Sequence, residues 1–157
     1  MAIQIDIAQR IARPPAEVIA FVADIEGWPR WLIASGIVGV HRAPGRAGTP
    51  VAAGETMVIE QRAAGRAGTF AVAVTAVEPG RRLALAGKDD DGVKIAIDAG
   101  VVPAAPDQSA TELRWSFRID LPFRFRIFEG MATPQVRQAA ALDLEALRLR
   151  LESTPRD

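Results

Sequence analysis

The stretch Leu113-Arg-Trp-Ser-Phe-Arg-Ile-Asp-Leu121 alternates apolar side chains with charged or small polar ones. Such a period of two is typical of a β-strand with one buried face. After this stretch the period changes, because from Thr133 to Glu152 apolar residues recur at intervals of three and four. These residues are Val136, Ala140, Leu144, Leu147 and Leu151. We therefore predict that the last strand is followed by a helix about 30 Å long with one apolar face.

Upstream of this region, alternating patterns between turns rich in Gly, Pro and Asp predict the other strands. The seven predicted strands are Ile3–Ala12, Gly36–Arg42, Ala53–Arg62, Gly68–Val77, Arg81–Gly87, Val93–Val101 and Ser109–Leu121. Two short helices are predicted after the first strand: Ala16–Val22, and a second one after Asp24 that carries Trp28 and Trp31. Short connections favour an antiparallel sheet. This order predicts an α+β fold, a seven-stranded curved sheet wrapped around the C-terminal helix.

The composition limits the classes of function. The chain has 157 residues, enough for one domain over 1–157, and 49% of them are hydrophobic. The 19 acidic residues balance the 19 basic ones, so no overall field attracts a nucleic acid. The absence of cysteine excludes disulfides and thiolate metal sites, and the single histidine, His41, cannot form a multi-histidine site. We expect no metal, no cofactor and no nucleic-acid partner.

The first ten residues alternate apolar and polar side chains, unlike a secretory signal peptide, which has a basic region and then an apolar one. No apolar run reaches the roughly eighteen residues of a membrane-spanning helix. We therefore expect a cytoplasmic protein without an integral membrane segment. Monomer and homodimer both remain open.

The inward faces of the predicted strands and helix would line a space between sheet and helix. The predicted ligand-binding residues there are Met57, Ile59, Gln61, Phe70, Val72, Leu85, Ile95, Trp115, Phe117 and Leu144. The alternative is that these side chains form a solid core. Trp115 and Phe117 favour a pocket, because large rings suit small-molecule sites. Gln61 could orient an oxygen of the ligand, since a buried amide needs a hydrogen-bond partner.

The segment Pro122–Phe128 joins the last strand to the long helix and carries three phenylalanines. We predict that Phe123 and Phe128 form an aromatic gate at the cavity mouth and contribute to the ligand site. The alternative is that the rings pack the start of the helix against the sheet.

Acid–base chemistry has little support on the inward faces, which offer no carboxylate pair. Glu60 and Arg62 alternate with Met57 and are expected outside, unless the strand register slips by one residue. His41 is expected to point to solvent, and the arginines between positions 114 and 126 are expected to form a solvated surface.

The segment Ile11-Ala-Arg-Pro-Pro-Ala-Glu-Val-Ile-Ala-Phe-Val-Ala-Asp-Ile-Glu-Gly-Trp-Pro-Arg-Trp31 resembles the opening of the START/polyketide-cyclase superfamily, also called SRPBCC. That opening has a strand, a proline, a short helix, an acidic residue and a tryptophan pair around a proline. The stretch Leu142-Asp-Leu-Glu-Ala-Leu-Arg-Leu-Arg-Leu-Glu152 is similar to the closing helix of the family. The order of elements matches over essentially the whole chain.

This resemblance implies a helix-grip fold with a cavity between sheet and helix. Members bind lipids, sterols or polyketides, and some cyclise or dehydrate polyketide chains. The family has no universal catalytic motif, so no catalytic residue is carried over to this chain. Fold alone does not fix function.

Three functions follow as hypotheses. The first is binding or transport of a small hydrophobic molecule, which the apolar inward faces and the missing acid–base pair favour over catalysis. The second is a polyketide cyclase or dehydratase-like enzyme, with Gln61, Glu60 or Arg62 as candidate polar groups. The third is a protein-interaction module, whose sign would be a filled core and an exposed apolar patch.

Overall fold

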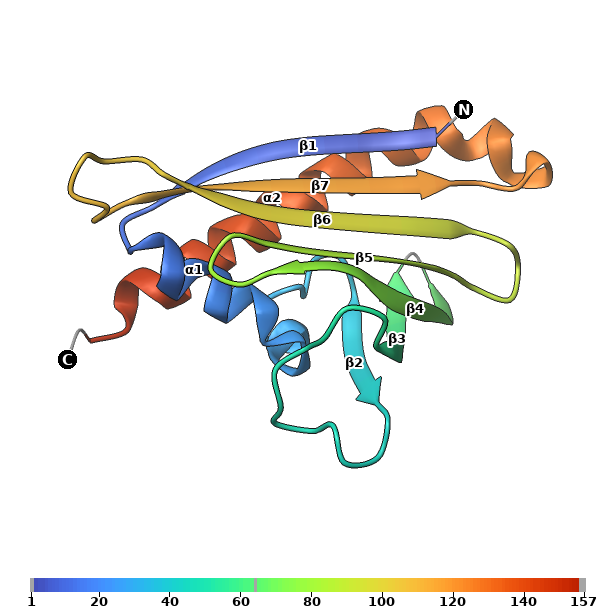
Figure 1. Ribbon diagram of the computed structural model, residues 1–157. Helices are drawn as coiled ribbons and strands as arrows, with labels where there is room; N and C mark the ends of the chain where they lie inside the picture. Colours follow the sequence, from blue (N-terminus) through green and yellow to red (C-terminus); the bar gives the residue numbers. More distant parts are fainter. Residues whose placement is uncertain (1, 64, 156–157) are drawn as a thin grey trace.

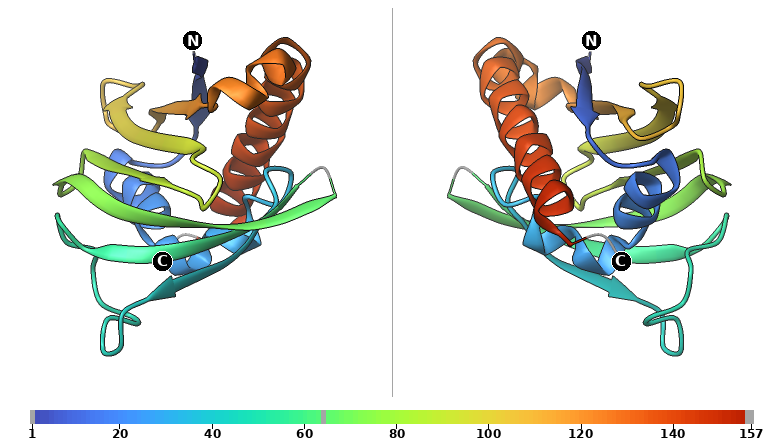
Figure 2. Two further views of the ribbon diagram at one scale, coloured as in Figure 1. Left: turned by 90° about the vertical axis from the view of Figure 1, so that its right-hand side faces the viewer. Right: turned by 90° about the vertical axis from the view of Figure 1, so that its left-hand side faces the viewer.

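Seven antiparallel strands form one sheet in the computed structural model, which describes residues 2–63 and 65–155 (Figure 1). The strands are β1 (Ala2–Ile11), β2 (Ile37–Arg42), β3 (Thr56–Ala63), β4 (Arg66–Glu78), β5 (Arg82–Lys88), β6 (Lys94–Pro103) and β7 (Thr111–Asp120). Their order in the sheet is β1-β7-β6-β5-β4-β3-β2, so β1 and β2 are the edges. The C-terminal helix α2 (Glu129–Ser153) lies across the concave side of the sheet (Figure 2). The predicted α+β helix-grip fold is confirmed.

The alternation that predicted the last strand also sets its register. Phe117 of β7 lies opposite Ile5 of β1 and Ile97 of β6, so inward-facing side chains meet across three strands. The register shifts between Val74 and Ala76 of β4, where the ladder to β5 is interrupted. Such an extra residue bends and twists a strand, which contributes to the curvature of the sheet.

Two short helices follow β1, as predicted. Helix α1 (Pro15–Ala23) begins with a proline, whose fixed φ suits a first helical turn, and it packs against β5, β6 and β7. The second is a 3₁₀ helix, η1 (Ile25–Arg30), which contains Pro29. Their buried residues belong to the main core between the sheet and α2.

The long helix starts earlier than predicted. It begins at Glu129 rather than Thr133, directly after a second 3₁₀ helix, η2 (Phe123–Phe128). Pro134 therefore lies inside the helix, although its position had suggested the first turn. A proline has no N–H for the carbonyl four residues back, so the helix loses one hydrogen bond near its start. None of the helices in the described residues is long and apolar enough to span a bilayer.

The two halves of α2 are held differently. In the C-terminal half, Leu144, Leu147 and Leu151 are buried in the main core. The buried Arg13 side chain donates to the carbonyl of Leu151 at 2.9 Å and also to those of Glu152 and Thr154, which satisfies the last turn.

In the N-terminal half the inward side chains are smaller. Ala132, Val136 and Ala140 pack against Ile3 and Ile5 of β1 in a second, minor cluster. Of these three helix residues only Ala140 is fully buried. This half of the helix therefore buries much less apolar surface than the other.

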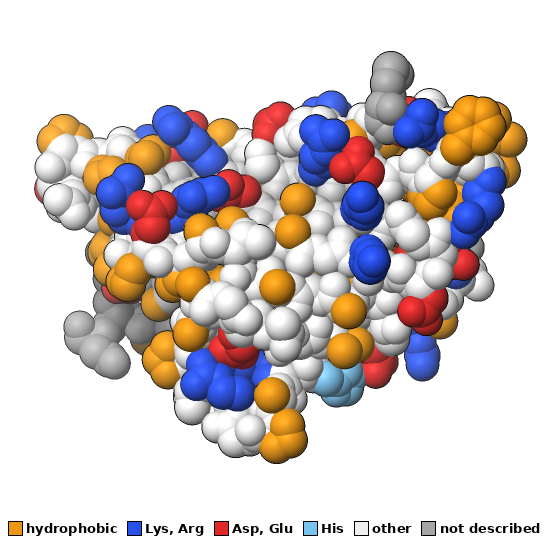
Figure 3. Space-filling model, turned by 45° about the vertical axis from the view of Figure 1, so that its right-hand side comes forward, with side chains coloured by type: hydrophobic (Ala, Val, Ile, Leu, Met, Phe, Trp, Pro, Cys, Tyr) orange, Lys and Arg blue, Asp and Glu red, His pale blue; other side chains and the backbone are white. Residues whose placement is uncertain are grey.

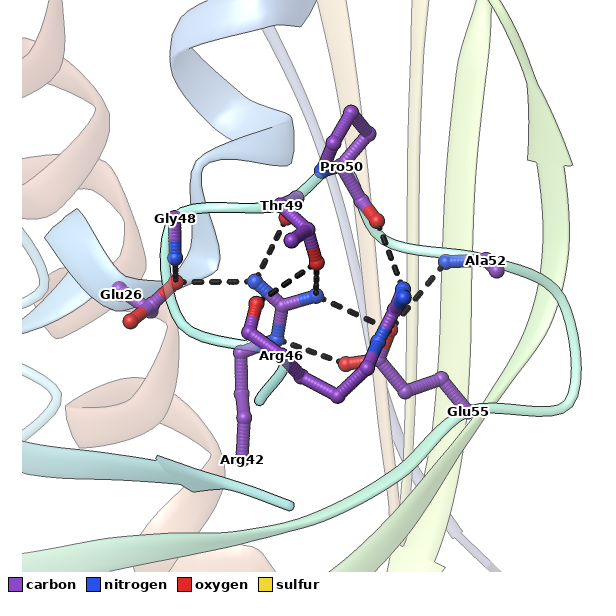
Figure 4. Close-up of polar contacts among 8 residues, drawn as sticks. All are labelled: Glu26, Arg42, Arg46, Gly48, Thr49, Pro50, Ala52 and Glu55. Atoms are coloured by element: carbon purple, nitrogen blue, oxygen red, sulfur yellow. Dashed lines mark hydrogen bonds and ion pairs between the residues drawn. The ribbon is translucent and has the colours of Figure 1, made fainter. Parts of the chain in front are cut away.

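A set of ion pairs around two buried side chains fixes the loop between β2 and β3 (Figure 4). We call it the Arg42 clamp, formed by Arg42 with Glu26, Arg46 and Glu55. The Arg42 guanidinium donates to Glu55 at 2.7 Å and to Glu26 at 2.9 Å, and Arg46 reaches Glu55 at 2.7 Å. The side chains of Arg42 and Glu55 are only 3% and 6% exposed. Arg42 also donates to the carbonyl of Thr49, so the loop is tied to η1 and to the end of β2.

Candidate functional site

A small cavity lies between the sheet and α2. Its walls come from η1 and the loop after it, from β2, β3, β4, β6 and β7, and from one helix residue. The lining residues are Trp28, Leu32, Ser35, Ile37, Ile59, Gln61, Phe70, Ile95, Ile97, Trp115, Phe117 and Ala140. Its open volume is about 40 Å³, room for one or two water molecules. Ligand pockets for drug-sized molecules measure roughly 300 to 1,000 Å³, so such a ligand needs the walls to move.

One wall of the cavity is built from tryptophans: Trp28 and Trp115 line it, and Trp31 packs against both. Trp28, Trp31 and Trp115 pack edge to face, with ring centroids 5.6 to 6.4 Å apart. Trp28 Nε1 donates to the carbonyl of Val22 at 2.8 Å, whereas the buried Trp31 Nε1 has no partner among the described residues. The sequence contains no further tryptophan and no tyrosine. Intrinsic fluorescence of this protein therefore reports from this wall alone.

One corner of the cavity is polar. Gln61 Nε2 donates to the backbone carbonyl of Ser35 at 2.8 Å. Because a carbonyl can only accept, this bond fixes which end of the amide carries the nitrogen. Gln61 Oε1 accepts no hydrogen bond from a described residue. An oriented acceptor without a donor thus lies on an otherwise apolar cavity.

Asp143 of α2 holds this corner in place from behind. Its carboxylate is 2% exposed and accepts the N–H of Ala34 at 2.7 Å and the N–H of Ser35 at 2.9 Å. Burial raises the pKa of Asp143, although the bonds from these groups and from the Ser35 hydroxyl oppose the shift. Gly36 completes the turn with a φ of +77°, where a Cβ would lie 2.1 Å from the Arg62 carbonyl oxygen. Only glycine fits there.

The comparisons with known proteins agree with this geometry. Residues 2–152 match the model of a family described as polyketide cyclase / dehydrase and lipid transport. The chain belongs to that family. No curated protein matches the sequence.

Solved structures share the fold of this family member at low sequence identity. A START superfamily protein from Mycobacterium smegmatis has a TM-score of 0.71 and 19% identity, covering 95% of this chain and 97% of its own. The Zhui aromatase/cyclase from Streptomyces sp. R1128 has a TM-score of 0.74 and 14% identity, with 97% and 94% covered. A protein from Thermus thermophilus has a TM-score of 0.73 and 13% identity, with 96% and 99% covered.

The structure of this polyketide cyclase/dehydrase-family chain places six of the twelve predicted site residues on the cavity. They are Ile59, Gln61, Phe70, Ile95, Trp115 and Phe117. Four others lie in the main core without lining the cavity: Met57, Val72, Leu85 and Leu144. The remaining two, Phe123 and Phe128, are on η2 and face away from it.

Several lining residues were missed by sequence reasoning. Leu32 and Ser35 come from the connection between η1 and β2, which has no periodicity, and Ile37 is the first residue of β2. Ala140 gave no sign beyond its place on the apolar stripe of α2. Asp143 had a detectable signal, since it is the one acid beside Ala140, Leu144 and Leu147 on that stripe. An acid at an inward helix position indicates a buried hydrogen-bond network.

At η2 the ring that packs inward is Phe125. It contacts the main core, and the Arg124 and Arg66 guanidinium carbons lie 4.7 and 5.8 Å from its ring centroid. Both arginines are bound to Asp91 in the β5–β6 turn: Arg66 by an ion pair, Arg124 by donating to the Asp91 carbonyl at 2.6 Å. Phe125 is therefore held between three segments of the chain.

Phe125 belongs to the partly buried margin of the core. Ile37, Phe117, Ile119 and Leu121 are half-buried there, and two of them, Ile37 and Phe117, also line the cavity. The cavity therefore reaches this margin.

A larger hollow of about 930 Å³ lies on the outer face of the sheet (Figure 3). Short side chains such as Ala71, Ala86 and Ala96 form its floor, and the sheet separates it from the cavity. His41 lines its border, faces solvent as predicted, and bonds to Glu60 at 2.6 Å. In residues 2–63 and 65–155 no three His, Asp or Glu side chains are placed to hold a metal ion.

Proposed function

We propose that this protein binds a small, largely apolar molecule carrying one hydrogen-bond donor, in the cavity between the sheet and α2. The observation that carries the proposal is the oriented Gln61 Oε1, an acceptor without a donor in an apolar cavity. A hydroxyl of the ligand would donate to this oxygen, and a hydrogen bond of this kind contributes about 0.5 to 1.5 kcal/mol. Membership of a family described as polyketide cyclase / dehydrase and lipid transport supports the same interpretation.

Binding requires the cavity to widen, and the N-terminal half of α2 is the part that can give way. Its inward side chains are small and partly exposed, whereas the other half is fixed by Leu147, Arg13 and Asp143. The opening we propose lies at the core margin beside Phe125. The gate residue is then Phe125 rather than Phe123 or Phe128, since only its ring packs inward.

A second candidate is a polyketide cyclase or dehydratase-like activity. The observation that favours it is the Ser35–Asp143 pair, which combines a hydroxyl-bearing residue on the cavity wall with a carboxyl whose pKa burial raises. A raised pKa brings a carboxyl closer to the range useful for proton transfer. In that case Asp143→Asn would abolish turnover of a linear polyketide mimic but leave its binding intact. Equal loss of binding would exclude the enzymatic role.

Tryptophan fluorescence tests the binding proposal directly, because Trp28 and Trp115 line the cavity and Trp31 packs against both. The probes are a medium-chain bromoalkanol and the bromoalkane of equal length, since bromine quenches an indole on contact. We expect saturable quenching by both, with the alkanol bound about tenfold more tightly because it donates to Gln61 Oε1. Gln61→Leu should remove this preference. Quenching that stays linear with probe concentration would overturn the proposal.

A matched pair of helix variants locates the site. Ala140→Val adds two methyl groups to the cavity wall and should weaken quenching by both probes. Ala141→Val makes the same change at the exposed neighbouring position and should leave quenching by both probes unchanged. Equal affinities in the two variants would place the bound probe outside the cavity.

A further inference from the structure

Four large apolar side chains are exposed together where η2 meets α2. Phe123 is 84%, Ile127 79%, Phe128 52% and Met131 74% exposed. We call this group the tip patch. Figure 3 shows hydrophobic side chains gathered beside basic ones at the end of the molecule where β7 leads into η2. Single exposed apolar side chains are normal on a protein surface, but a contiguous group of them marks a docking surface.

The size of the tip patch limits what can cover it. Four such side chains expose on the order of 500 Å². That is comparable with the largest apolar patch of a typical monomer, which is often functional. It is less than the roughly 800 Å² per partner of a standard stable protein interface. Three residues of the patch lie on the short 3₁₀ helix η2 and Met131 lies at the start of α2, a segment at one end of the molecule (Figure 1). A small apolar tip at the end of a molecule suits insertion into a soft apolar medium better than a flat protein contact.

Basic side chains accompany the tip patch. Arg124 and Arg126 lie between Phe123 and Ile127 in the sequence, and Arg126 has no ion pair with a described residue. The acid nearest in sequence, Glu129, is partly buried, and its Oε1 is shielded from solvent. The surface of the tip is therefore apolar and positive, although the whole chain has no net charge. Phe and Ile next to Arg is the composition of elements that lie in the interface of anionic bilayers.

We propose that the tip patch docks onto the surface of a bilayer that contains anionic lipid. The side chains of Phe123, Ile127, Phe128 and Met131 enter the acyl boundary, and Arg126 lies among the lipid phosphates. Docking of this kind places the core margin beside Phe125 against the membrane. It requires no spanning helix and does not depend on which molecule the cavity holds.

Vesicle sedimentation of the full chain tests the proposal. We expect binding to phosphatidylcholine vesicles that contain phosphatidylglycerol and weaker binding to phosphatidylcholine alone. The double variant Phe123→Ser/Ile127→Ser should bind the mixed vesicles at least about tenfold more weakly, because two exposed side chains no longer enter the apolar layer. Arg126→Gln should lower affinity about fivefold, for the mixed vesicles only. Ile33→Ser is the matched control, since Ile33 is 67% exposed but lies outside the tip patch.

Three outcomes would overturn the proposal: no sedimentation with either vesicle, equal binding by wild type and double variant, or equal losses in the double variant and Ile33→Ser. Analytical ultracentrifugation tests whether these side chains are exposed because a second copy of the chain covers them. A concentration-dependent dimer that the double variant abolishes would assign the tip patch to a second copy of the chain. Bromoalkanol quenching without vesicles keeps this test apart from the proposed function. The bromoalkanol should quench the tryptophan fluorescence of the double variant as strongly as that of the wild type. Failure of cavity binding and failure of membrane docking are therefore seen in separate measurements.

Discussion

The two ends of the molecule use their side chains in opposite ways. At one end the Arg42 clamp buries charged groups to fix a loop whose sequence is rich in Gly and Pro (Figure 4). At the other end η2 carries three phenylalanines, of which only Phe125 packs inward. Charge is buried where the chain must be held, and apolar surface is exposed where we place docking and opening. The end with the aromatic residues is thus the less firmly fixed one.

The largest expected effect comes from breaking the clamp. Arg42→Met keeps the apolar stem but removes both hydrogen bonds of Arg42 to Glu55 and its bond to Glu26. We expect the free energy of unfolding to fall by about 3 to 5 kcal/mol in urea titrations, because the buried Glu55 then keeps only the partly exposed Arg46. Arg46→Met should cost about 1 kcal/mol or less, since Arg46 is partly exposed and Glu55 keeps its bond to Arg42. Similar losses in both variants would show that the clamp does not depend on Arg42.

The next effect compares the two halves of α2. Leu147→Ala removes a fully buried side chain and should cost about 3 kcal/mol of unfolding free energy. Val136→Ala in the N-terminal half should cost about 1 kcal/mol or less, because Val136 is only half-buried. The same urea titrations measure both. A cost for Val136→Ala as large as that for Leu147→Ala would mean that the whole helix is equally fixed.

The clamp also predicts a loss of stability in acid. Hydrogen bonds from Arg42 and Arg46 lower the pKa of Glu55 from 4.5 to about 2. The unfolded chain therefore binds this proton first, and the stability that Glu55 contributes is lost as pH falls from about 4.5 to about 2. The loss should approach about 3 kcal/mol, and Glu55→Gln should remove this part of the pH dependence.

Asp143 should act in the opposite direction. Its pKa is raised from 3.8 by burial, so its contribution to stability falls as pH rises above that value. Urea titrations of Asp143→Asn across the same pH range isolate this effect. If Asp143→Asn and Glu55→Gln change the pH profile in the same direction, one of the two assignments is wrong.

The smallest expected effect is at the tip patch. Phe123→Ser should change the unfolding free energy by no more than about 0.5 kcal/mol, because the ring makes few contacts in the folded chain. Thermal unfolding is the measurement. A loss above about 1 kcal/mol would show that Phe123 supports the fold, which would weaken the case for a docking role.

The sequence predicted the elements whose side chains repeat with a clear period. The alternation in β7 predicted its buried face, and the stripe from Ala140 to Leu151 predicted the inward face of α2. The start of α2 was missed because Pro134 is typical of a first turn, whereas η2 leads directly into the helix.

The cavity was harder to predict because half of its lining depends on tertiary placement. Ser35 and Ile37 reach it only through a turn at Gly36 and the bond network of Asp143. Sequence alone also could not say which phenylalanine of η2 faces the core, since a 3₁₀ segment has no amphipathic period. The Arg42 clamp joins residues up to 16 positions apart in the chain, and no local pattern links them.

Hydrogen–deuterium exchange with and without the bromoalkanol tests most directly the claim that the cavity opens by movement of the N-terminal half of α2. In the free protein, residues 129–139 should exchange faster than residues 140–153, and the probe should slow exchange in 129–139 and in η2. Residues 43–55, which the Arg42 clamp holds, should not change. Protection confined to the clamp loop, or none in 129–139 while the tryptophans are quenched, would contradict the account.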